Sequence, residues 1–346
     1  MTMTAEQAAA RIHGVKSRLA AEITKRHFQR RPELEQRYGP RGRAKCEEDA
    51  HFHLSYLAEA IAVERPELFG QYIAWAGKML RSRGVPEDDL RGDLAEMLEV
   101  SAEVAPEVLP HARAAVEQAL RSLEGREHGL AEPISDLARR YLEAALREGP
   151  LEASHFIDEL VASGMTAADI YVGVLQPAMH ELGSLWQLNK VSVAEEHYGT
   201  AVTQRIMAKI YSDQLMHRPS GALIVVACVM GELHELGARM LSDLLELAGY
   251  RTDYLGAMTP PAALVEYVCQ RGTRCVALSA SITPHLAQVR QTIQLLRADP
   301  RCRDVKVIVG GGAFNALPSL WRMVGADAWA ADARSAVEET RRLLAS

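Results

Sequence analysis

The sequence lacks the features of a membrane or exported protein. No window offers the roughly 18 uninterrupted apolar residues that a membrane span requires. The N-terminus, Met-Thr-Met-Thr-Ala-Glu, has no basic segment followed by an apolar one, as a signal peptide would have. Cysteine is scarce, and its five residues are scattered along the chain, so reduced thiols are the simplest interpretation. These absences predict a cytoplasmic protein without a disulfide framework.

An overall excess of positive charge is also missing. The net charge of −6 argues against general nucleic-acid binding, and no helix-turn-helix pattern is recognisable near the N-terminus. We therefore expect no direct contact with nucleic acid or membrane. The one basic stretch, residues 25–45, is either a solvated face or a collar for an anionic ligand.

What the chain does contain is enough sequence for two or three domains, since it has 346 residues of which 48% are hydrophobic. Residues 1–128 read as helices, with turn chemistry at residues 38–43. Residues 129–217 read as four helices with short connections, which predicts an antiparallel bundle. Residues 218–346 alternate strand and helix. The predicted fold is multidomain, with α-helical domains followed by an α/β domain. That last domain contains a five-stranded parallel Rossmann-like sheet of the flavodoxin-like type.

Polar or glycine-rich motifs follow three of the predicted strands. Glu232-Leu-His234-Glu-Leu-Gly237 follows residues 222–229, Ser279-Ala-Ser281 follows 275–278, and a Gly-Gly-Gly run follows 305–309. A single His in a loop is more often incidental than functional. Three motifs at the carboxyl ends of three strands are a stronger signal, because parallel α/β sheets bind ligands at that edge.

These motifs and their spacing resemble the cobalamin-binding domain of methionine synthase and the B12-dependent mutases. The resemblance makes His234 the ligand that replaces the cofactor's own base beneath cobalt, with Glu232 holding the other ring nitrogen. Glu232 stands where Asp is usual, and Ser281 where Leu is usual. The remaining contacts, to the nucleotide tail, would come from Gly237, Ser279, Ser281, Gly310, Gly311 and Gly312.

The predicted bundle carries Trp186, followed after nine residues by Glu196 and His197. Taken alone, this spacing fits a buried Trp under an ordinary helix start equally well. Ahead of a cobalamin domain it resembles the light-responsive adenosylcobalamin-dependent repressors, whose bundle covers the upper face of the corrin. In those proteins a His after the Trp binds cobalt once light has removed the adenosyl group. Gln187 occupies that position here, which leaves His180, His197 or water as substitutes.

A helical N-terminal domain in place of a DNA-binding one makes the whole arrangement resemble the photocobilins, which bind adenosylcobalamin and biliverdin. Asp49, His53 and Tyr56 share one helical face, and a Gly-rich turn with Arg41 and Arg43 precedes them. The resemblance implies that these residues contact biliverdin, with Cys46 as a candidate attachment point. A solvated polar helix face is the competing interpretation.

The resemblance thus implies a light sensor, not an enzyme, in which cleavage of the cobalt–carbon bond changes the assembly of a homo-oligomer. The chain would then either signal to an output protein in trans or be the sensory part of a larger arrangement. The alternative is a corrinoid carrier of a methyltransferase system, which also needs a bundle and His234. A mutase subunit is excluded by length, because its substrate barrel takes about 250 residues.

Overall fold

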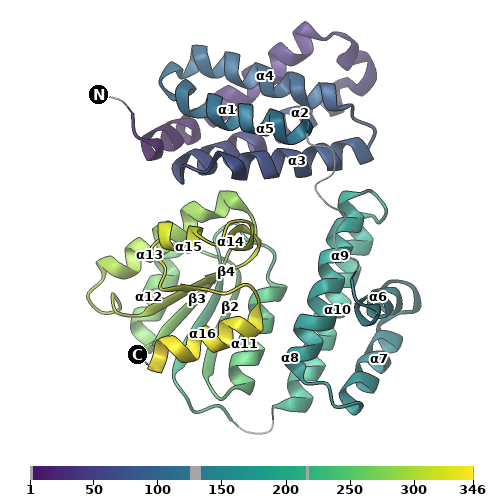
Figure 1. Cartoon of the computed structure of the whole chain (residues 1–346), viewed down its shortest axis with the longest axis vertical. Helices are drawn as coiled ribbons and strands as arrows, with labels where there is room; N and C mark the ends of the chain where they lie inside the picture. The colour runs from purple at the N-terminus through teal and green to yellow at the C-terminus, as the bar shows by residue number, and fades with distance from the viewer. Residues whose placement is uncertain (1–2, 125–133, 216–217, 346) are drawn as a thin grey trace. The chain divides into compact units, whose positions relative to one another are not determined.

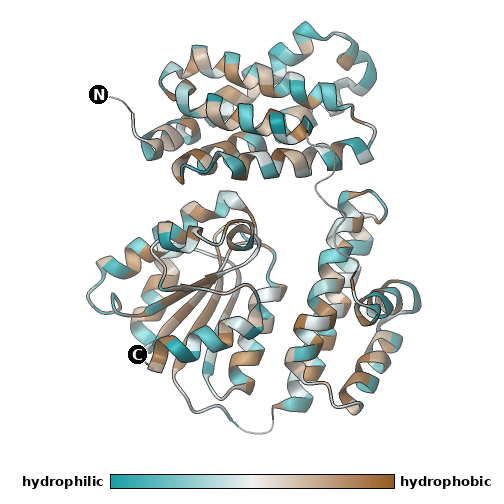
Figure 2. Ribbon diagram, viewed as in Figure 1, coloured by the Kyte–Doolittle hydropathy of each residue, from teal (hydrophilic) through white to brown (hydrophobic). Residues whose placement is uncertain are grey.

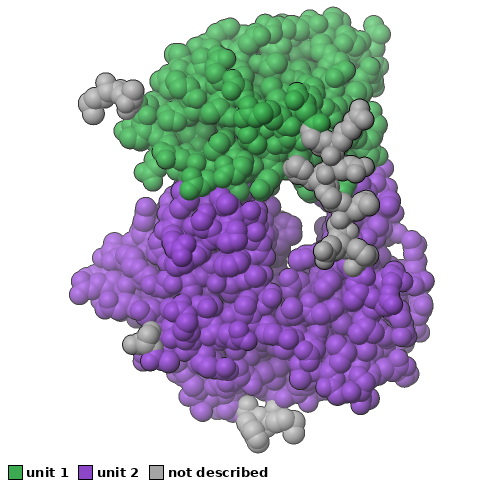
Figure 3. Space-filling view, in the orientation of Figure 1, with its two compact units in different colours: residues 1–130 green, residues 131–346 purple. Residues whose placement is uncertain are grey.

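The computed structural model describes residues 3–124, 134–215 and 218–345. It divides into two compact units, Met1–Leu130 and Ala131–Ser346 (Figure 3). The boundaries expected after residues 128 and 217 lie outside the described residues. The further division of the second unit into a bundle domain and a sheet domain therefore stays a prediction.

The first unit is helical wherever it is described, as expected. Its five α-helices and one 3-10 turn are α1 (Ala5–Arg30), α2 (Glu33–Ala62), α3 (Pro66–Ser82), α4 (Glu87–Val104), η1 (Pro106–Val108) and α5 (Leu109–Glu124). The turn predicted over residues 38–43 is wrong in extent. Only Gly39 leaves helical geometry, with φ 61° and ψ −168°, and α2 continues beyond it as a kinked helix. Pro40 supplies no N–H, so the kink falls at the preceding glycine.

The second unit begins with the expected antiparallel helices. They are α6 (Asp136–Glu143), the π-helical turn η2 (Ala144–Glu148), α7 (Pro150–Ala162), α8 (Ala167–Ile170), the π-helical turn η3 (Tyr171–Leu175), α9 (Gln176–Gln187) and α10 (Val193–Gln214). Thr166 and Ser192 each form a capping box with the acidic residue three positions on. These caps fix where α8 and α10 begin.

A five-stranded sheet follows, and its strands are β1 (Leu223–Val229), β2 (Arg251–Thr259), β3 (Cys275–Ser279), β4 (Lys306–Gly310) and β5 (Ala328–Trp329). All pairings are parallel, in the order β2-β1-β3-β4-β5, which confirms the predicted fold class. Figure 2 shows that the strands are predominantly hydrophobic, and β1 is buried along its whole length. A strand buried on both faces needs helices on both sides.

Helices cover the two faces of the sheet (Figure 1). The pair α11 (Leu236–Leu247) and α16 (Ala333–Ala345) pack together, as do α12 (Pro261–Arg271) and α13 (Leu286–Ala298). Two short helices, α14 (Gly312–Ala316) and α15 (Leu320–Met323), follow β4 and precede β5 in the sequence. None of the helices in the described ranges combines the length and apolar character of a membrane span.

One hydrophobic core joins the bundle helices to the sheet. Within this core the buried hydroxyl of Tyr171 donates to Asp243 Oδ2 on α11 at 2.9 Å. Burial raises the pKa of Asp243 to about 6, although the hydrogen bond from Tyr171 opposes that rise. Because a buried polar group is costly without a partner, this contact specifies how the bundle helices dock on α11.

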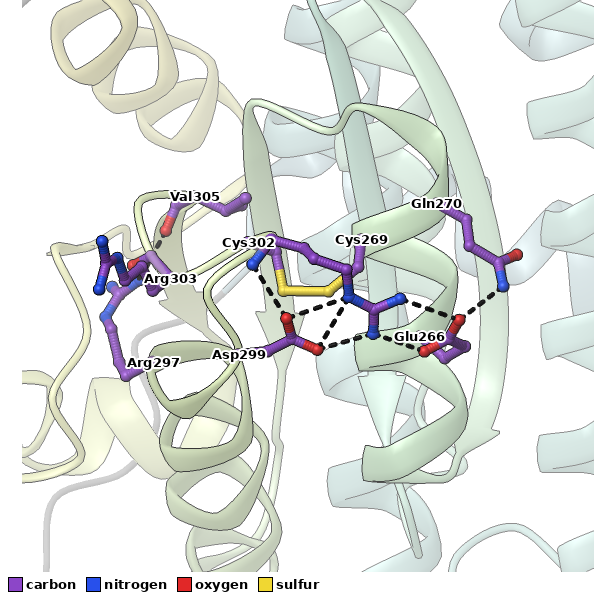
Figure 4. Close-up of a disulfide and its surroundings, with 9 residues drawn as sticks. Glu266, Cys269, Gln270, Arg297, Asp299, Cys302, Arg303 and Val305 are labelled. Carbon is purple, nitrogen blue, oxygen red and sulfur yellow. Dashed lines mark hydrogen bonds and ion pairs between the residues drawn. A yellow bond between two sulfur atoms is a disulfide. The ribbon is translucent and has the colours of Figure 1, made fainter.

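The expectation of five reduced thiols is wrong for one pair. Cys269 at the end of α12 and Cys302 after α13 form a disulfide across 33 residues (Figure 4). Beside it, Arg301 donates to Asp299 and Glu266, each at 2.7 Å. No spacing pattern indicates this pairing, because only the packing of α12 on α13 brings the two cysteines together. Cys46, Cys228 and Cys275 are free.

The disulfide predicts a measurable loss on substitution. Cys302→Ser should lower the free energy of unfolding by about 3 kcal/mol, since closing a loop of this length restricts the unfolded chain. Urea denaturation without reductant measures the loss, and Cys46→Ser is the control because Cys46 is free. A thiol titration of denatured, unreduced protein should find three free cysteines; five would contradict the bridge.

Candidate functional site

The three motif-bearing strands end at the same level of the sheet. Cys228 of β1 pairs with Ser279 of β3, and Ser279 pairs with Gly310 of β4. After β1 the chain continues to β2, which lies on one side of the β1–β3 pair. After β3 it continues to β4, which lies on the other side. In this topology the loops diverge between β1 and β3, which opens a crevice at the carboxyl edge. The loop of residues 230–235 and the segment of residues 280–285 are the connections at this crevice.

The loop after β1 is held in shape by its own side chain and by β2. Glu232 N donates to Val229 O at 3.0 Å, and Met258 N donates to Glu232 O at 3.1 Å. Glu232 Oε1 accepts two hydrogen bonds from His234, from its backbone N at 2.8 Å and from Nδ1 at 2.6 Å. The carboxylate therefore fixes both the backbone and the ring of His234.

Glu232 is completely buried, and its second oxygen is also satisfied. Oε2 accepts from Ser281 N at 2.5 Å and from His285 Nδ1 at 3.0 Å. Burial alone would raise the pKa of this carboxyl, but the hydrogen bonds from His234, His285 and Ser281 hold it far below its ordinary value. Glu232 is therefore ionised, and the Nδ1 atoms of both histidines must carry protons in order to donate to it.

The His234 ring is suited to bind a metal through its other nitrogen. With Nδ1 protonated and bound to Glu232, the lone pair of the neutral ring resides on Nε2. The hydrogen bond to Glu232 raises the pKa of His234, and a smaller raising effect comes from the Glu196 carboxylate. The side chain is 70% exposed, although its partner Glu232 is fully buried. This combination of an anchored Nδ1 and an accessible Nε2 fits the lower ligand of a cobalt centre.

The surroundings of His234 also fit a large, partly apolar ligand. Leu233 is 70% exposed, and Met230 and Met258 are exposed as well. Exposed apolar side chains on and beside this loop are compatible with contact to a partly apolar ligand. A Cβ added at Gly237 would meet nothing within 4 Å, so the start of α11 borders open space. Space there is compatible with the predicted contact to the nucleotide tail.

The glycine run after β4 has a structural explanation of its own. A Cβ at Gly311 would lie 2.5 Å from Ala280 O, and one at Gly312 would lie 2.7 Å from Ser281 O. Gly311 also has φ +99°, which side chains disfavour. These two glycines thus allow the loop after β4 to pack on the loop after β3, and a Cβ at Gly310 would meet Ala330 O at 3.2 Å. Their contact with a cofactor stays a prediction.

Glu196, on α10 of the bundle, is a carboxylate that raises the pKa of His234. One face of α10 carries Glu196, Thr200 and Gln204; Thr200 donates to Glu196 at 3.2 Å, and Gln204 donates to Glu235 Oε1 at 3.1 Å. This face of α10 therefore borders the loop of residues 230–235. His197 is 75% exposed and bonds to Glu196 at 2.6 Å.

The other bundle candidates lie on α9. Trp186 is half-buried and packs against the core, as a structural Trp would. Gln187 is buried, and His180 lines a cavity of about 340 Å³ together with Ser184 and Asp332. A role for Trp186, Glu196 or His197 above a corrin stays a prediction.

In the first unit, the predicted bilin residues form part of an internal polar cluster. His53 is buried, with Nδ1 2.9 Å from the Tyr72 hydroxyl and Nε2 3.8 Å from Asp93. Tyr56 stacks on Tyr72 with ring centroids 3.6 Å apart. Burial raises the pKa of Asp49 to about 6 and of Asp93 to about 7, and it lowers that of His53 to about 4.

The predicted cationic turn does not join this cluster. Arg43 lies 3.7 Å from Glu35 and over the Phe28 ring, and Arg41 is exposed. Burial raises the pKa of the Cys46 thiol, which makes it a poor nucleophile for covalent attachment. Tyr72 and Asp93 were missed in the sequence because they lie on other helices.

His285 is the main site residue that the sequence failed to indicate. It lies at the end of the 3-10 turn η4 (Thr283–His285), just before α13. Its signal was a histidine six residues beyond Ser279 at a helix start, which alone is indistinguishable from a surface residue. Tyr254 and Gln204, both bonded to Glu235, were likewise missed.

The buried carboxylate predicts a pH-dependent effect of substitution. The folded pKa of Glu232 lies below its ordinary value of 4.5, so ionisation stabilises the fold above that pH and the stabilisation is lost as the pH falls through the folded pKa. Glu232→Gln should therefore lower the melting temperature at pH 7, and the difference from wild type should shrink toward pH 3. A constant difference across this range would contradict the assignment of an ionised Glu232.

Comparisons with known proteins identify the family. Two matches, each to a family described as "B12 binding domain", cover residues 222–341 and residues 130–211. Dimethylamine corrinoid protein 3 of Methanosarcina acetivorans is 27% identical over 231 residues, covering 65% of this chain and 100% of that protein. Dimethylamine corrinoid protein 3 of Methanosarcina mazei is 31% identical over 124 residues, covering 36% of this chain and 72% of that protein.

A solved structure shares the fold. The monomethylamine corrinoid protein of Methanosarcina barkeri superposes with a TM-score of 0.53 at 18% identity, covering 59% of this chain and 96% of that one. At this identity the likeness concerns the fold alone.

These findings correct the predicted function. The relatives include dimethylamine corrinoid proteins and the HTH-type transcriptional repressor CarA of Myxococcus xanthus, which is 31% identical over 182 residues, covering 51% of this chain and 59% of that protein. Membership of the photocobilins, the light-sensing function and the light-dependent homo-oligomer with an output protein in trans are therefore wrong. The strand-end motifs are specific for a corrin but do not distinguish an adenosyl from a methyl group above it, and the N-terminal likeness had no sharp motif.

Biliverdin likewise has no support from any of these relatives, and His53 and Tyr56 belong instead to the internal polar cluster of the first unit. The cobalamin part of the prediction is confirmed at the level of the cofactor class. The chain belongs to the family of B12-binding corrinoid proteins that includes the dimethylamine corrinoid proteins, and its cofactor is a corrinoid.

Proposed function

We propose that this chain is the corrinoid carrier of a methyltransferase system. The observation that carries the proposal is the pair Glu232 and His234, an exposed imidazole anchored by a fully buried carboxylate at the tip of β1. Its setting in a chain related to dimethylamine corrinoid proteins supports a carrier over other cobalamin proteins. A carrier is not itself an enzyme, because the methyl donor and acceptor are bound by partner proteins.

The chain's own residues would serve the carrier in two ways. His234 would hold cobalt from below through Nε2, and Glu232 would keep Nδ1 protonated and the ring in position. When bound, the corrinoid supplies a cobalt centre that takes up a methyl group and gives it away. Hydrogen bonding to Glu232 increases the electron density that the imidazole offers, so the carboxylate tunes the ligand as well as orienting it.

The substrate class follows from the relatives. Because they are dimethylamine corrinoid proteins, we propose a methylated amine as the ultimate methyl source and a cognate amine methyltransferase as the partner. His197, Tyr198 and Val193, at the start of α10, are exposed. An exposed surface at this end of the bundle is compatible with docking of a methyltransferase, and with a methyl rather than an adenosyl group above the corrin.

The ligand assignment is tested by His234→Ala. Removing the imidazole should weaken hydroxocobalamin binding by about 10-fold or more and abolish protein ligation of cobalt. Equilibrium dialysis measures the affinity, and the absorption spectrum of the bound cofactor reports the ligation. His155→Ala, an exposed His on α7, is the matched control. An unchanged spectrum and affinity in His234→Ala would remove His234 from the site.

The carrier function is tested by methyl transfer. Purified chain loaded with hydroxocobalamin and chemically reduced should acquire a methyl group from dimethylamine when an amine methyltransferase is added. The change in absorption of the bound cofactor measures the reaction, and His234→Ala serves as the comparison. If a panel of methyltransferases for methylated amines leaves the loaded wild-type chain unmethylated, the proposal fails.

The choice of upper substituent gives a separate prediction. Wild-type chain should bind methylcobalamin at least as tightly as adenosylcobalamin in a competition assay. Trp186→Ala should change the two affinities by similar factors, because the ring packs against the protein core rather than selecting the substituent. A strong preference for adenosylcobalamin that Trp186→Ala removes would contradict the carrier interpretation.

A further inference from the structure

A second group of metal-ligand side chains lies where α12 packs on α13. Cys269 belongs to the last turn of α12, and Asp299 and Cys302 follow α13. The two sulfurs and a carboxylate oxygen of Asp299 all lie within 4.8 Å of one another. Figure 4 shows the Asp299 carboxylate beside the disulfide. Because α12 and α13 lead into the beginnings of β3 and β4, this group lies at the opposite edge of the sheet from Glu232 and His234.

The backbone presents Asp299 and Cys302 together. Cys302 N donates to Asp299 O at 3.1 Å, and this turn keeps the two residues within about 7 Å of each other. Two ligands separated by two residues are a common spacing in zinc sites. Cys269 completes the set from a different helix, with its Cα 5.1 Å from that of Cys302. Both sulfurs can therefore reach one ion, since tetrahedral zinc with bonds of about 2.3 Å sets its sulfur ligands about 3.8 Å apart.

Asp299 is oriented by Arg301, which is not a ligand. Arg301 donates to both carboxylate oxygens, from its backbone N to Oδ1 at 2.9 Å and from Nη2 to Oδ2 at 2.7 Å. The same guanidinium holds Glu266 at 2.7 Å, which fixes it from the other side. Carboxylates that bind metals are themselves hydrogen-bonded in this way. A carboxylate has about four acceptor positions, so these donors leave room for an ion.

The bridge is open to reduction. Cys302 is buried, but Cys269 and Asp299 are partly exposed, so a small dithiol can approach the first sulfur. Thiol–disulfide exchange with a dithiol passes two electrons and two protons to the bridge, giving two thiols here and a disulfide in the reductant. A Zn²⁺ ion that binds afterwards displaces the two thiol protons, because thiolate is the form that ligates metal.

We propose that Cys269, Cys302 and Asp299 form a redox-controlled zinc site. In the oxidised chain the sulfurs are bonded to each other and hold no ion. In the reduced chain two thiolates and the carboxylate bind Zn²⁺, with water in the fourth position. Sulfur ligands select Zn²⁺ over Mg²⁺ and Ca²⁺, which take oxygen ligands. The site involves neither His234 nor the corrinoid, so it stands independently of the proposed function.

The experiment uses the full chain without added corrinoid, in oxidised and reduced forms. The reduced form is prepared with a phosphine, which is then removed under nitrogen. Zn²⁺ is titrated in competition with a chromophoric chelator, which gives the affinity and the number of ions bound. Alkylation by iodoacetamide, followed by mass spectrometry, identifies the cysteines that Zn²⁺ protects. Melting temperatures show that the reduced chains are folded before they are compared.

Two variants test the ligands, each with a matched control. Cys302→Ser removes a sulfur, and Cys46→Ser removes a free cysteine of the first unit. Asp299→Asn removes the carboxylate charge, and Asp304→Asn makes the same change at an exposed residue of the same connection. All four are compared with wild type in the reduced form. Loss of the disulfide therefore does not enter the comparison.

We expect the reduced wild-type chain to bind a Zn²⁺ ion that neither the oxidised chain nor reduced Cys302→Ser binds, and this ion should protect Cys269 and Cys302 from alkylation. Asp299→Asn should weaken its binding by about 10-fold or more, and both controls should match wild type. Equal Zn²⁺ binding by the oxidised and reduced chains, or by reduced wild type and Cys302→Ser, would overturn the site. Unchanged affinity in Asp299→Asn would overturn the three-ligand assignment.

Discussion

The site depends on one buried carboxylate. Glu232 has no exposed surface, yet it stays ionised because four N–H groups donate to its two oxygens. Burial of a charge without such partners would cost several kcal/mol and would favour the neutral acid. The four donors come from two different loops, so the charged side chain of Glu232 is stable in its buried position only when both loops are folded. The orientation of the His234 ring therefore depends on the folding of both loops.

The parallel sheet brings the two loops together. The order β2-β1-β3-β4-β5 makes β1 and β3 neighbours, although 45 residues separate the end of one from the start of the other. The Cys228–Ser279 and Ser279–Gly310 pairings then set three loops at one level. Gly311 and Gly312 let the third loop pack against the second without side chains between them. This backbone packing fixes the position of the loop after β3, from which Ser281 N and His285 donate to Glu232.

The first unit shows how a polar cluster can resemble a ligand site. Asp49, His53 and Tyr56 share a helical face, as their spacing indicated, but their neighbours turn out to be Tyr72 and Asp93 from other helices. The raised pKa values of Asp49 and Asp93, to about 6 and about 7, and the lowered pKa of His53 all reflect burial. His53 contacts Tyr72 and Asp93 inside the helical unit. Arg43, which was expected to complete a bilin site, contacts Glu35 and Phe28 instead.

The sequence by itself determined the fold class, the approximate strands and the Glu232–His234 motif. Each rests on a local signal: apolar runs of strand length, helical periodicity, or polar residues a few positions apart. The tertiary structure alone decided that His285 completes the contacts of Glu232, that Gly231 makes room for it, and that Cys269 meets Cys302. These contacts join residues 33 to 54 positions apart, and no periodicity in a single chain encodes them. They form because the sheet order and the packing of α12 on α13 bring the segments into contact.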